Sequence, residues 1–259
     1  MEPGSATAIV LADLKARIAH VGRPGKGSDA ALPFGIPEID ARLPAAGLTL
    51  GALHEVAGGG PDIEHGAAAA LLVAGVLARL PGPVLWVLER PDLFAPALAA
   101  AGLHPDRVIY AEAGKPAAVL LSMEECLRHD GLAGVVGELS GPLTLTASRR
   151  LQLAAERSGV TCFALRRSRS HDDAQLKEPT AAATRWRVSA LPSAPPLASS
   201  PETPGLGRSR WHLELTRCRG GEPASWIVEA SDATGHLGLA ADARDRSAPA
   251  AWERRRAGG

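Results

Sequence analysis

Residues 35 to 66 read GIPEIDARLPAAGLTLGALHEVAGGGPDIEHG, and the rest of this 259-residue chain is arranged around them. The stretch predicts a short helix, a turn, an apolar strand and a glycine loop. A long apolar helix is expected next, over AAAALLVAGVLARL at residues 67 to 80. Because proteins hold phosphate on the backbone N–H groups of such a loop at a helix N-terminus, the stretch has the layout of a nucleotide site.

The loop nevertheless lacks the residues that bind nucleotide. A phosphate loop of the form G-x-x-x-x-G-K-[ST] uses its Lys for the β- and γ-phosphates and its hydroxyl for magnesium. With Gly66 as the second glycine, Ala67 and Ala68 stand in those two places, and Glu64 would repel phosphate. We therefore expect no cofactor and no ATP hydrolysis, and favour glycines that only turn the chain from strand to helix. These glycines are Gly58, Gly59 and Gly60.

Beyond the loop, short apolar runs alternate with helical segments. Such runs are typical of strands buried inside a parallel sheet. They are VLWVLE at 84–89, RVIYAEA at 107–113, AGVVGEL at 133–139, VTCFAL at 160–165 and, later, TRWRVSAL at 184–191; helices are expected at 91–101, 115–131 and 147–159. This regular alternation predicts an α/β fold with a doubly wound, mainly parallel sheet.

Composition divides the chain into a core and two flanking parts. A helical repeat of apolar residues lies near the start, and the end is charged and rich in Ala and Arg. A WHLELTRCRGGEPASWIVEA segment alternates as a β-hairpin does. We expect an N-terminal helix and flexible linker over 1–31, a core over 32–240 with a polar excursion at 166–180, a Pro/Ser linker at 192–209 and the C-terminal hairpin, and a disordered tail over 241–259.

Charge and cysteine usage narrow the class of protein. The formal net charge is zero, but residues 1–163 carry 13 Lys and Arg against 17 Asp and Glu, and residues 164–259 carry 15 against 11. An anionic partner would therefore meet the C-terminal part. The three cysteines form no C-x-x-C pair and no apolar run could span a bilayer, so we expect a cytoplasmic protein with reduced thiols and no membrane partner.

Three segments together resemble a known family. FGIPEIDARLPAAGLTLGALHEVAG, residues 34–58, resembles the start of the RecA superfamily core, a G-x-x-x-x-D-x-x-L turn followed by a strand into the phosphate loop. With the degenerate loop, ERPDLFAPALAAAGLHPDRVIY at 89–110 and GLGRSRWHLELTRCRGGEPASWIVE at 205–229, the chain resembles the ImuA family. That family comprises RecA-like proteins of bacterial damage-inducible mutagenesis cassettes, and the resemblance spans about residues 32 to 240.

The resemblance implies a RecA-like fold and a non-catalytic adaptor of error-prone translesion synthesis in the SOS response. Its implied partners are ImuB, a Y-family polymerase homologue, and a replicative-type error-prone polymerase, with RecA and single-stranded DNA as further candidates. Such a protein would associate with the nucleoid when engaged. Two alternatives stay open. One is a divergent RecA-type ATPase, and the other is a cell division inhibitor resembling SulA. The C-terminal hairpin beyond the core argues against the comparison with SulA.

The resemblance also directs attention to particular side chains. Glu138 falls near the Walker B acid and Glu89 near the carboxylate that polarises water, although neither has a phosphate to serve here. In RecA-like proteins the polar excursion faces single-stranded DNA. Its cations are Arg166, Arg167, Arg169 and Lys177. They could pair with phosphates, but neighbouring acids and missing aromatics also fit a solvated loop.

Two further features complete the sequence-based expectations. Trp252 lies in the charged tail, where a lone aromatic suits a short anchor for a protein partner. His54 and His65 with Glu64 match no metal-ligand spacing, so no metal site is expected. No serine lies in a G-x-S-x-G elbow, which removes support for a hydrolase.

Overall fold

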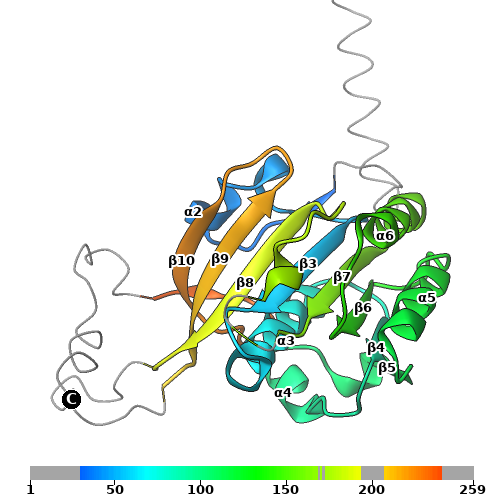
Figure 1. Ribbon diagram of the computed structural model, residues 1–259. Helices are drawn as coiled ribbons and strands as arrows, with labels where there is room; N and C mark the ends of the chain where they lie inside the picture. Colours follow the sequence, from blue (N-terminus) through cyan, green and yellow to red (C-terminus); the bar gives the residue numbers. More distant parts are fainter. Residues whose placement is uncertain (1–29, 169, 171–172, 194–206, 241–259) are drawn as a thin grey trace, which may run out of the picture.

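The computed structural model describes residues 30–168, 170, 173–193 and 207–240. A nine-stranded sheet runs through the molecule, and helices cover both of its faces (Figure 1). The strand order is β11 (Gly238–Leu239), β10 (Ala224–Glu229), β9 (Arg210–Cys218), β8 (Thr184–Leu191), β3 (Leu53–Gly58), β7 (Thr161–Arg166), β6 (Gly134–Leu139), β4 (Val84–Leu88) and β5 (Val108–Glu112). The predicted doubly wound α/β architecture is confirmed.

Six neighbouring strands, β8 to β5 in that order, are parallel, and the other three are antiparallel. β3, which carries the glycine loop, lies between β7 and β8 in the middle of the sheet. All six of its residues are buried, as a strand covered on both faces requires. The predicted C-terminal hairpin is present as β9 and β10, in which Trp226 pairs with Leu213.

Each face of the sheet has its own apolar core. On one face, α3 (Asp62–Ala78) and α4 (Ala95–Ala100) cover Trp86 and Val136, and the Trp186 ring lies 5.4 Å from that of Phe34. On the other face, α5 (Pro116–Cys126) packs on the sheet through Met123, and α6 (Leu145–Ser158) packs on it through Leu151. The short elements are β1 (Ala31–Leu32), α2 (Pro37–Asp40), η1 (Pro44–Ala46), β2 (Leu48–Thr49), η2 (Pro105–Arg107) and η3 (Ala174–Leu176).

Helix α3 begins earlier than the sequence predicted. The expected start was Ala67, but the helix starts at Asp62, directly after Pro61. The φ of Pro61, −55°, is compatible with the start of a helix. The carboxylates in the first turn interact favourably with the positive end of the helix dipole. Consequently Gly66, Ala67 and Ala68 lie within the helix, and the loop between β3 and α3 is too short to wrap a phosphate.

A buried polar chain crosses the sheet beside the loop strand. His54 Nε2 lies 2.8 Å from the Thr49 carbonyl, which can only accept, so this nitrogen carries the proton. Nδ1 then accepts from the Thr184 hydroxyl at 2.7 Å, and that oxygen accepts from Trp186 Nε1 at 2.8 Å. Burial lowers the pKa of His54 to about 4, so the imidazole is neutral at pH 7. His54 is thus a structural residue that links β2, β3 and β8.

Several predicted segments lie outside the described residues. They are the N-terminal helix within residues 1–29, most of the Pro/Ser linker at residues 194–206, and the tail at 241–259. Trp252 and Arg169 fall in such stretches.

Candidate functional site

The glycine loop is closed by contacts within the protein. The Gly59 N–H donates to the Val188 carbonyl at 2.9 Å, and the Asp62 N–H donates to the Ser168 carbonyl at 2.8 Å. In a phosphate site these backbone donors face the ligand. Here one is used by β8 and the other by the segment that follows β7. Two of the backbone donors at the loop are therefore used by carbonyls of the protein.

The loop also packs tightly against β8. A Cβ at Gly59 would lie 1.7 Å from the Ser189 hydroxyl oxygen, so only glycine fits this approach. The next helical turn is fixed as well, because His65 Nδ1 accepts from the Ala190 N–H at 3.1 Å. Gly58, Gly59 and Gly60 are all buried. These contacts hold the loop and the first turns of α3 closely against β8.

Arg167 lies next to the loop and pairs with three carboxylates. Arg167 Nε donates to Glu138 at 2.9 Å, and its two terminal nitrogens donate to both oxygens of Asp92, at 2.7 and 2.5 Å. Its Nη1 also lies 3.5 Å from the Asp62 carboxylate at the start of α3. The guanidinium of Arg167, the residue after β7, therefore joins three segments that are far apart in sequence: the end of β6, the loop after β4 and the start of α3. We call these four residues the Arg167 cluster.

The electrostatics of the Arg167 cluster follow from the burial of Glu138. This side chain is almost completely buried, and it accepts a hydrogen bond from Trp86 Nε1 at 2.9 Å. Burial raises the pKa of Glu138, and Arg167 opposes that rise. The hydrogen bonds from Arg167 lower the pKa of Asp92, whereas desolvation raises that of Asp62. The guanidinium of Arg167 is thus the counter-charge that compensates the buried charge of Glu138.

Glu89, the second acid suggested by the resemblance, is also engaged by protein donors. One of its carboxylate oxygens accepts from the Ser140 N–H at 3.0 Å and the other from the Ser140 hydroxyl at 2.6 Å. Both Glu89 and Glu138 lie at the C-terminal edge of the parallel strands, where α/β proteins place ligands. In this chain the carboxylates of Glu89 and Glu138 at that edge already accept hydrogen bonds from groups of the protein.

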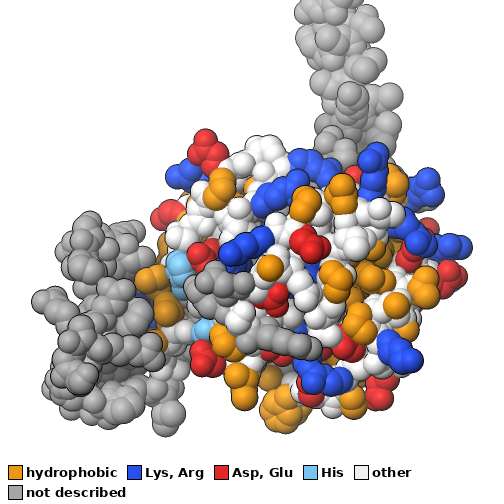
Figure 2. All heavy atoms as spheres, in the orientation of Figure 1, with side chains coloured by type: hydrophobic (Ala, Val, Ile, Leu, Met, Phe, Trp, Pro, Cys, Tyr) orange, Lys and Arg blue, Asp and Glu red, His pale blue; other side chains and the backbone are white. Residues whose placement is uncertain are grey.

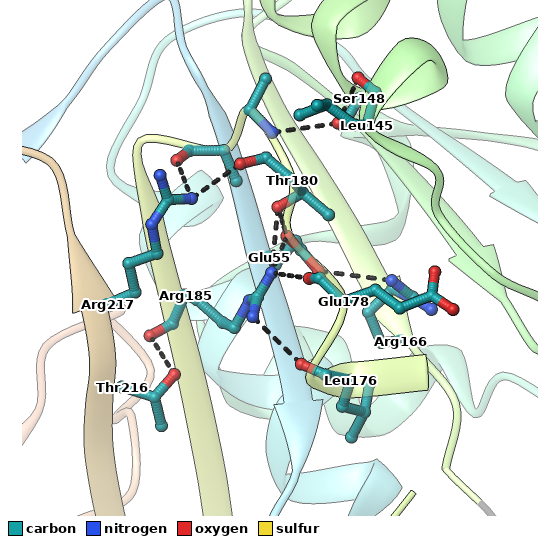
Figure 3. A network of polar contacts seen from close by, with 12 residues as sticks. Glu55, Leu145, Ser148, Arg166, Leu176, Glu178, Thr180, Arg185, Thr216 and Arg217 are labelled. Carbon is teal, nitrogen blue, oxygen red and sulfur yellow. Dashed lines mark hydrogen bonds and ion pairs between the residues drawn. The ribbon is translucent and has the colours of Figure 1, made fainter. Parts of the chain in front are cut away.

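A second ion-pair network lies on the opposite side of β3 (Figure 3). Arg166 Nη1 is 3.3 Å from a Glu55 oxygen, and its Nη2 donates to the Gly141 carbonyl at 3.0 Å. Arg185 Nη2 lies 3.2 Å from the other Glu55 oxygen, which also accepts from the Thr180 hydroxyl. Figure 3 shows the two arginines converging on Glu55 from opposite sides. Burial lowers the pKa of Arg166, and Glu55 opposes that effect.

The expectation that Arg166 and Arg167 contact DNA phosphates stays a prediction, although both side chains are engaged by carboxylates within the protein. The Arg166 side chain is 2% exposed, and Arg167 is held by Glu138, Asp92 and Asp62. The physical reason is that buried carboxylates at Glu55 and Glu138 need paired cations, and the two arginines supply them.

The polar excursion returns to the sheet rather than extending from it. Arg185 donates to the carbonyls of Leu176 and Glu178, at 3.1 and 2.8 Å, and the Ala181 N–H donates to the Ser148 hydroxyl of α6 at 3.0 Å. Within this segment Lys177 is exposed at the end of η3. Lys177 is therefore the described cation of the excursion whose side chain lies at the surface.

The sequence reasoning missed Asp62, Asp92 and Glu55. Glu55 is an acid in a strand that is buried along its whole length, and an unpaired buried carboxylate is costly, so this position signals a cation partner. Asp62 and Asp92 carry no such signal, because each follows a turn where acids are common.

The described residues contain neither a cluster of metal ligands nor a membrane-spanning helix. No group of three or more His, Cys, Asp or Glu side chains is placed to hold a metal ion in the ranges that the structure covers. Among the described helices, none is both long and apolar enough to cross a bilayer.

Comparison with known proteins identifies the family. Two curated relatives, both named Protein ImuA and from two strains of Caulobacter vibrioides (NA1000/CB15N and ATCC 19089/CB 15), are each 43% identical over 213 residues. The alignment covers 79% of this chain and 85% of each relative. The chain belongs to the ImuA family. No protein-family model matches it.

A solved structure confirms the RecA-like fold of this ImuA family member. The crystal structure of the RadB recombinase superposes with a TM-score of 0.55 and covers 81% of this chain and 99% of its own. The two sequences are 14% identical, so this likeness concerns the fold alone. In this ImuA family member the Arg167 cluster lies beside the glycine loop between β3 and α3.

Proposed function

We propose that this ImuA family member is a non-catalytic adaptor in an error-prone translesion DNA synthesis complex of the bacterial DNA damage response. Its partners in this proposal are an ImuB-type Y-family polymerase homologue and an error-prone replicative-type polymerase. RecA and single-stranded DNA are further candidates. The observation that supports the absence of a nucleotide cycle is the Arg167 cluster beside a loop in which the Gly59 and Asp62 N–H groups already donate to protein carbonyls.

Nucleotide binding would be costly at this loop. A phosphate would have to displace the Ser168 carbonyl from the Asp62 N–H and approach the carboxylates of Asp62 and Asp92. Arg167 could meet the phosphate only by leaving Glu138, and stripping a buried charge of its partner costs about 3–5 kcal/mol. Millimolar ligand affinity corresponds to about 4 kcal/mol of binding free energy, so this cost removes most of it.

The same face offers an apolar surface to a protein partner. Ile63 is 95% exposed and Phe94 is 68% exposed, although side chains of this size are usually buried. Ile63 follows Asp62 directly, and Phe94 lies two residues after Asp92. Both of these acids are paired with Arg167. An exposed aromatic and a branched aliphatic side chain beside an ion-pair cluster are typical anchors of a protein interface.

Two measurements test this proposal. Calorimetric titration of the full chain with Mg-ATP, and with a non-hydrolysable analogue, should give no heat of binding up to millimolar ligand. Detectable micromolar binding that weakens in Glu138→Ala would overturn the non-catalytic assignment and favour a divergent ATPase.

The partner surface is tested by affinity pull-down with purified ImuB-type protein. Ile63→Asp with Phe94→Asp should weaken capture about 30-fold, the equivalent of ~2 kcal/mol at an interface anchor. Ile227→Asp, on β10 at the other end of the sheet, is the matched control and should bind as the wild type does. Unchanged capture by the Ile63/Phe94 variant would rule out this face.

A further inference from the structure

Strand β5 forms one end of the sheet, and its outer edge is open. It pairs with β4 on one side, and none of the described strands pairs with its other side. Figure 1 shows β5 at the margin of the molecule, next to β4. Every residue of β4 is buried, whereas in β5 only Val108 is. The sheet therefore ends in a strand that the described part of the chain leaves uncovered.

This open edge carries large apolar side chains. Ile109 is 53% exposed and Tyr110 is 38% exposed, and as neighbours in a strand they lie on opposite faces of the sheet. Hydrophobic side chains gather on the side of the molecule where α5 and β5 lie, with charged side chains around them (Figure 2). The strand contains neither Lys nor Pro, which proteins use to keep an exposed edge from pairing. An edge of this composition is a template for another strand.

The backbone of β5 determines which residues an added strand would meet. The Ala113 N–H donates to the Leu88 carbonyl at 2.9 Å, and Leu88 lies opposite Glu112 in the ladder. Successive residues of a strand direct their N–H and C=O groups to alternate sides. Val108, Tyr110 and Glu112 therefore direct these groups away from β4, toward the open edge.

The length of the strand at the other end of the sheet indicates how the edge is covered. That strand, β11, has only two residues, Gly238–Leu239. Joining β5 to β11 of the next molecule would leave most of β5 uncovered, and such head-to-tail contacts continue into fibres. A two-fold contact between two β5 strands closes the assembly and covers both edges at once.

Charge selects one register for two antiparallel β5 strands. With Tyr110 opposite Tyr110 of the second copy, Val108 lies opposite Glu112, and no two acids face each other. Slipping the strands by two residues places Asp106 opposite Glu112 in one direction, and makes the two Glu112 side chains diagonal neighbours in the other. Asp106 before the strand and Lys115 after it are both exposed, and the antiparallel arrangement brings the one near the other across the dimer.

The same register covers both exposed side chains. Tyr110 packs on its own counterpart on one face, and Ile109 lies opposite Ala111 of the second copy on the other face. Val108 belongs to the core beneath α3 and α4, and Ala111 packs against the core beneath α5. Each face of the joined sheet would therefore continue a core that is already present.

We propose that this protein forms a two-fold dimer in which the β5 strands of two copies pair antiparallel, Tyr110 against Tyr110, and join the two sheets into one. Each opposed pair of outward-directed residues exchanges two hydrogen bonds, so the contact has about six. The contact is one strand wide and small for an interface, so we expect a dissociation constant on the order of 10 μM. The pairing is independent of the proposed adaptor function and of its partners.

Sedimentation velocity of the full chain tests the dimer, at concentrations from about ten-fold below to about ten-fold above that dissociation constant. The wild type should change from monomer to dimer over this range. Tyr110→Lys places two like charges opposite each other on the two-fold axis and should raise the dissociation constant at least about ten-fold. Ile227→Lys, on β10 and 37% exposed, is the matched control and should dimerise as the wild type does.

Mixing two variants tests the register. Tyr110→Glu alone should weaken the dimer as Tyr110→Lys does, whereas an equimolar mixture of the two variants should dimerise again, because opposite charges then meet on the axis. A wild type that stays monomeric, a Tyr110→Lys variant that dimerises as strongly as the wild type, or a mixture that stays monomeric would overturn the proposal.

Hydrogen exchange read residue by residue by NMR locates the contact. The Tyr110 amide should exchange slowly where the dimer forms and fast on dilution, whereas the Ala113 amide, bonded to Leu88, should be protected at both concentrations. Tyr110 protection that does not depend on concentration would assign the edge to another segment of the same chain. Protection that appears only after an ImuB-type protein is added would assign it to that partner, and either result would contradict the dimer.

Discussion

Replacing Arg167 by Met should destabilise the folded state by about 3 kcal/mol at pH 7. The substitution removes the counter-charge of Glu138, which is buried, and breaking such a pair costs about 3–5 kcal/mol. The ion pairs with Asp92 and Asp62 are more exposed and contribute under about 1 kcal/mol each. The estimate lies at the lower end because Glu138 can bind a proton instead of remaining charged.

Urea unfolding monitored by circular dichroism measures this change. For a domain of this size, 3 kcal/mol corresponds to a fall in melting temperature of about 6–12 °C. Arg90→Met is the matched control, because this neighbouring arginine is exposed and its loss should change stability by less than about 0.5 kcal/mol.

A double-mutant cycle isolates the Arg167–Glu138 interaction. Glu138→Gln keeps an oxygen for Trp86 Nε1 and removes the buried charge, so Arg167→Met should cost much less in that background. We expect a coupling free energy of about 2 kcal/mol, well above the ~0.5 kcal/mol of independent sites. Additive effects of the two substitutions would refute the assignment of Arg167 as the counter-charge of Glu138.

The pH dependence supplies an independent check. A carboxyl whose pKa is raised in the folded state binds more protons there than in the unfolded chain, so stability falls as pH rises through the folded-state pKa. Loss of Arg167 raises the pKa of Glu138 further, because Arg167 opposes the effect of burial. The stability deficit of Arg167→Met should therefore be larger at pH 7.5 than at pH 5. A deficit that is equal at both pH values contradicts a charge-based role.

Three other predictions concern the β-sheet beside the loop. Thr184→Val leaves the buried indole N–H of Trp186 and the His54 ring nitrogen without partners. The free energy of unfolding, measured in urea, should therefore fall by about 3 kcal/mol. Thr216→Val, at an exposed site on β9, is the control and should lower it by less than about 0.5 kcal/mol. Burial lowers the pKa of His54 to about 4, so as the pH falls the unfolded chain binds the proton before the folded protein does. The free energy of unfolding should therefore fall by up to ~3 kcal/mol between about pH 6.5 and pH 4. In His54→Gln this dependence on pH should be weaker. Gly59→Ala should lower the melting temperature through its clash with Ser189, and Ser189→Gly should restore part of the loss; an unchanged melting temperature in Gly59→Ala would refute the close packing.

Much of the fold was predictable because strand and helix patterns are local. TRWRVSAL was predicted as a strand over residues 184–191, and β8 has these bounds. The apolar run VLWVLE and strand β4 differ by a single residue, Glu89, at the C-terminal end. The misplaced start of α3 has a local cause as well, since the acidic first turn after Pro61 looked like loop and is favourable for a helix N-terminus.

The Arg167 cluster was not predictable from the same patterns. A run of arginines beside acids at residues 166–173 has the composition of a solvated loop, and nothing local distinguishes a buried cation from an exposed one. The partners of Arg166 and Arg167 are Glu55 and Glu138, on strands that become neighbours only in the folded sheet. Burial of the loop depends in the same way on Val188 of β8.

The position of β3 in the sheet sets the order in which a growing chain can fold. β3 is made early, but its two neighbours are residues 162–166 of β7 and 184–188 of β8. At about 5–20 residues per second, the ribosome takes on the order of 10 s to supply them. During that time the strand has both hydrogen-bonding edges open, which is a liability for aggregation. The whole domain must therefore close late in synthesis, and a nascent chain that stops before Val188 lacks the carbonyl that holds Gly59 in place.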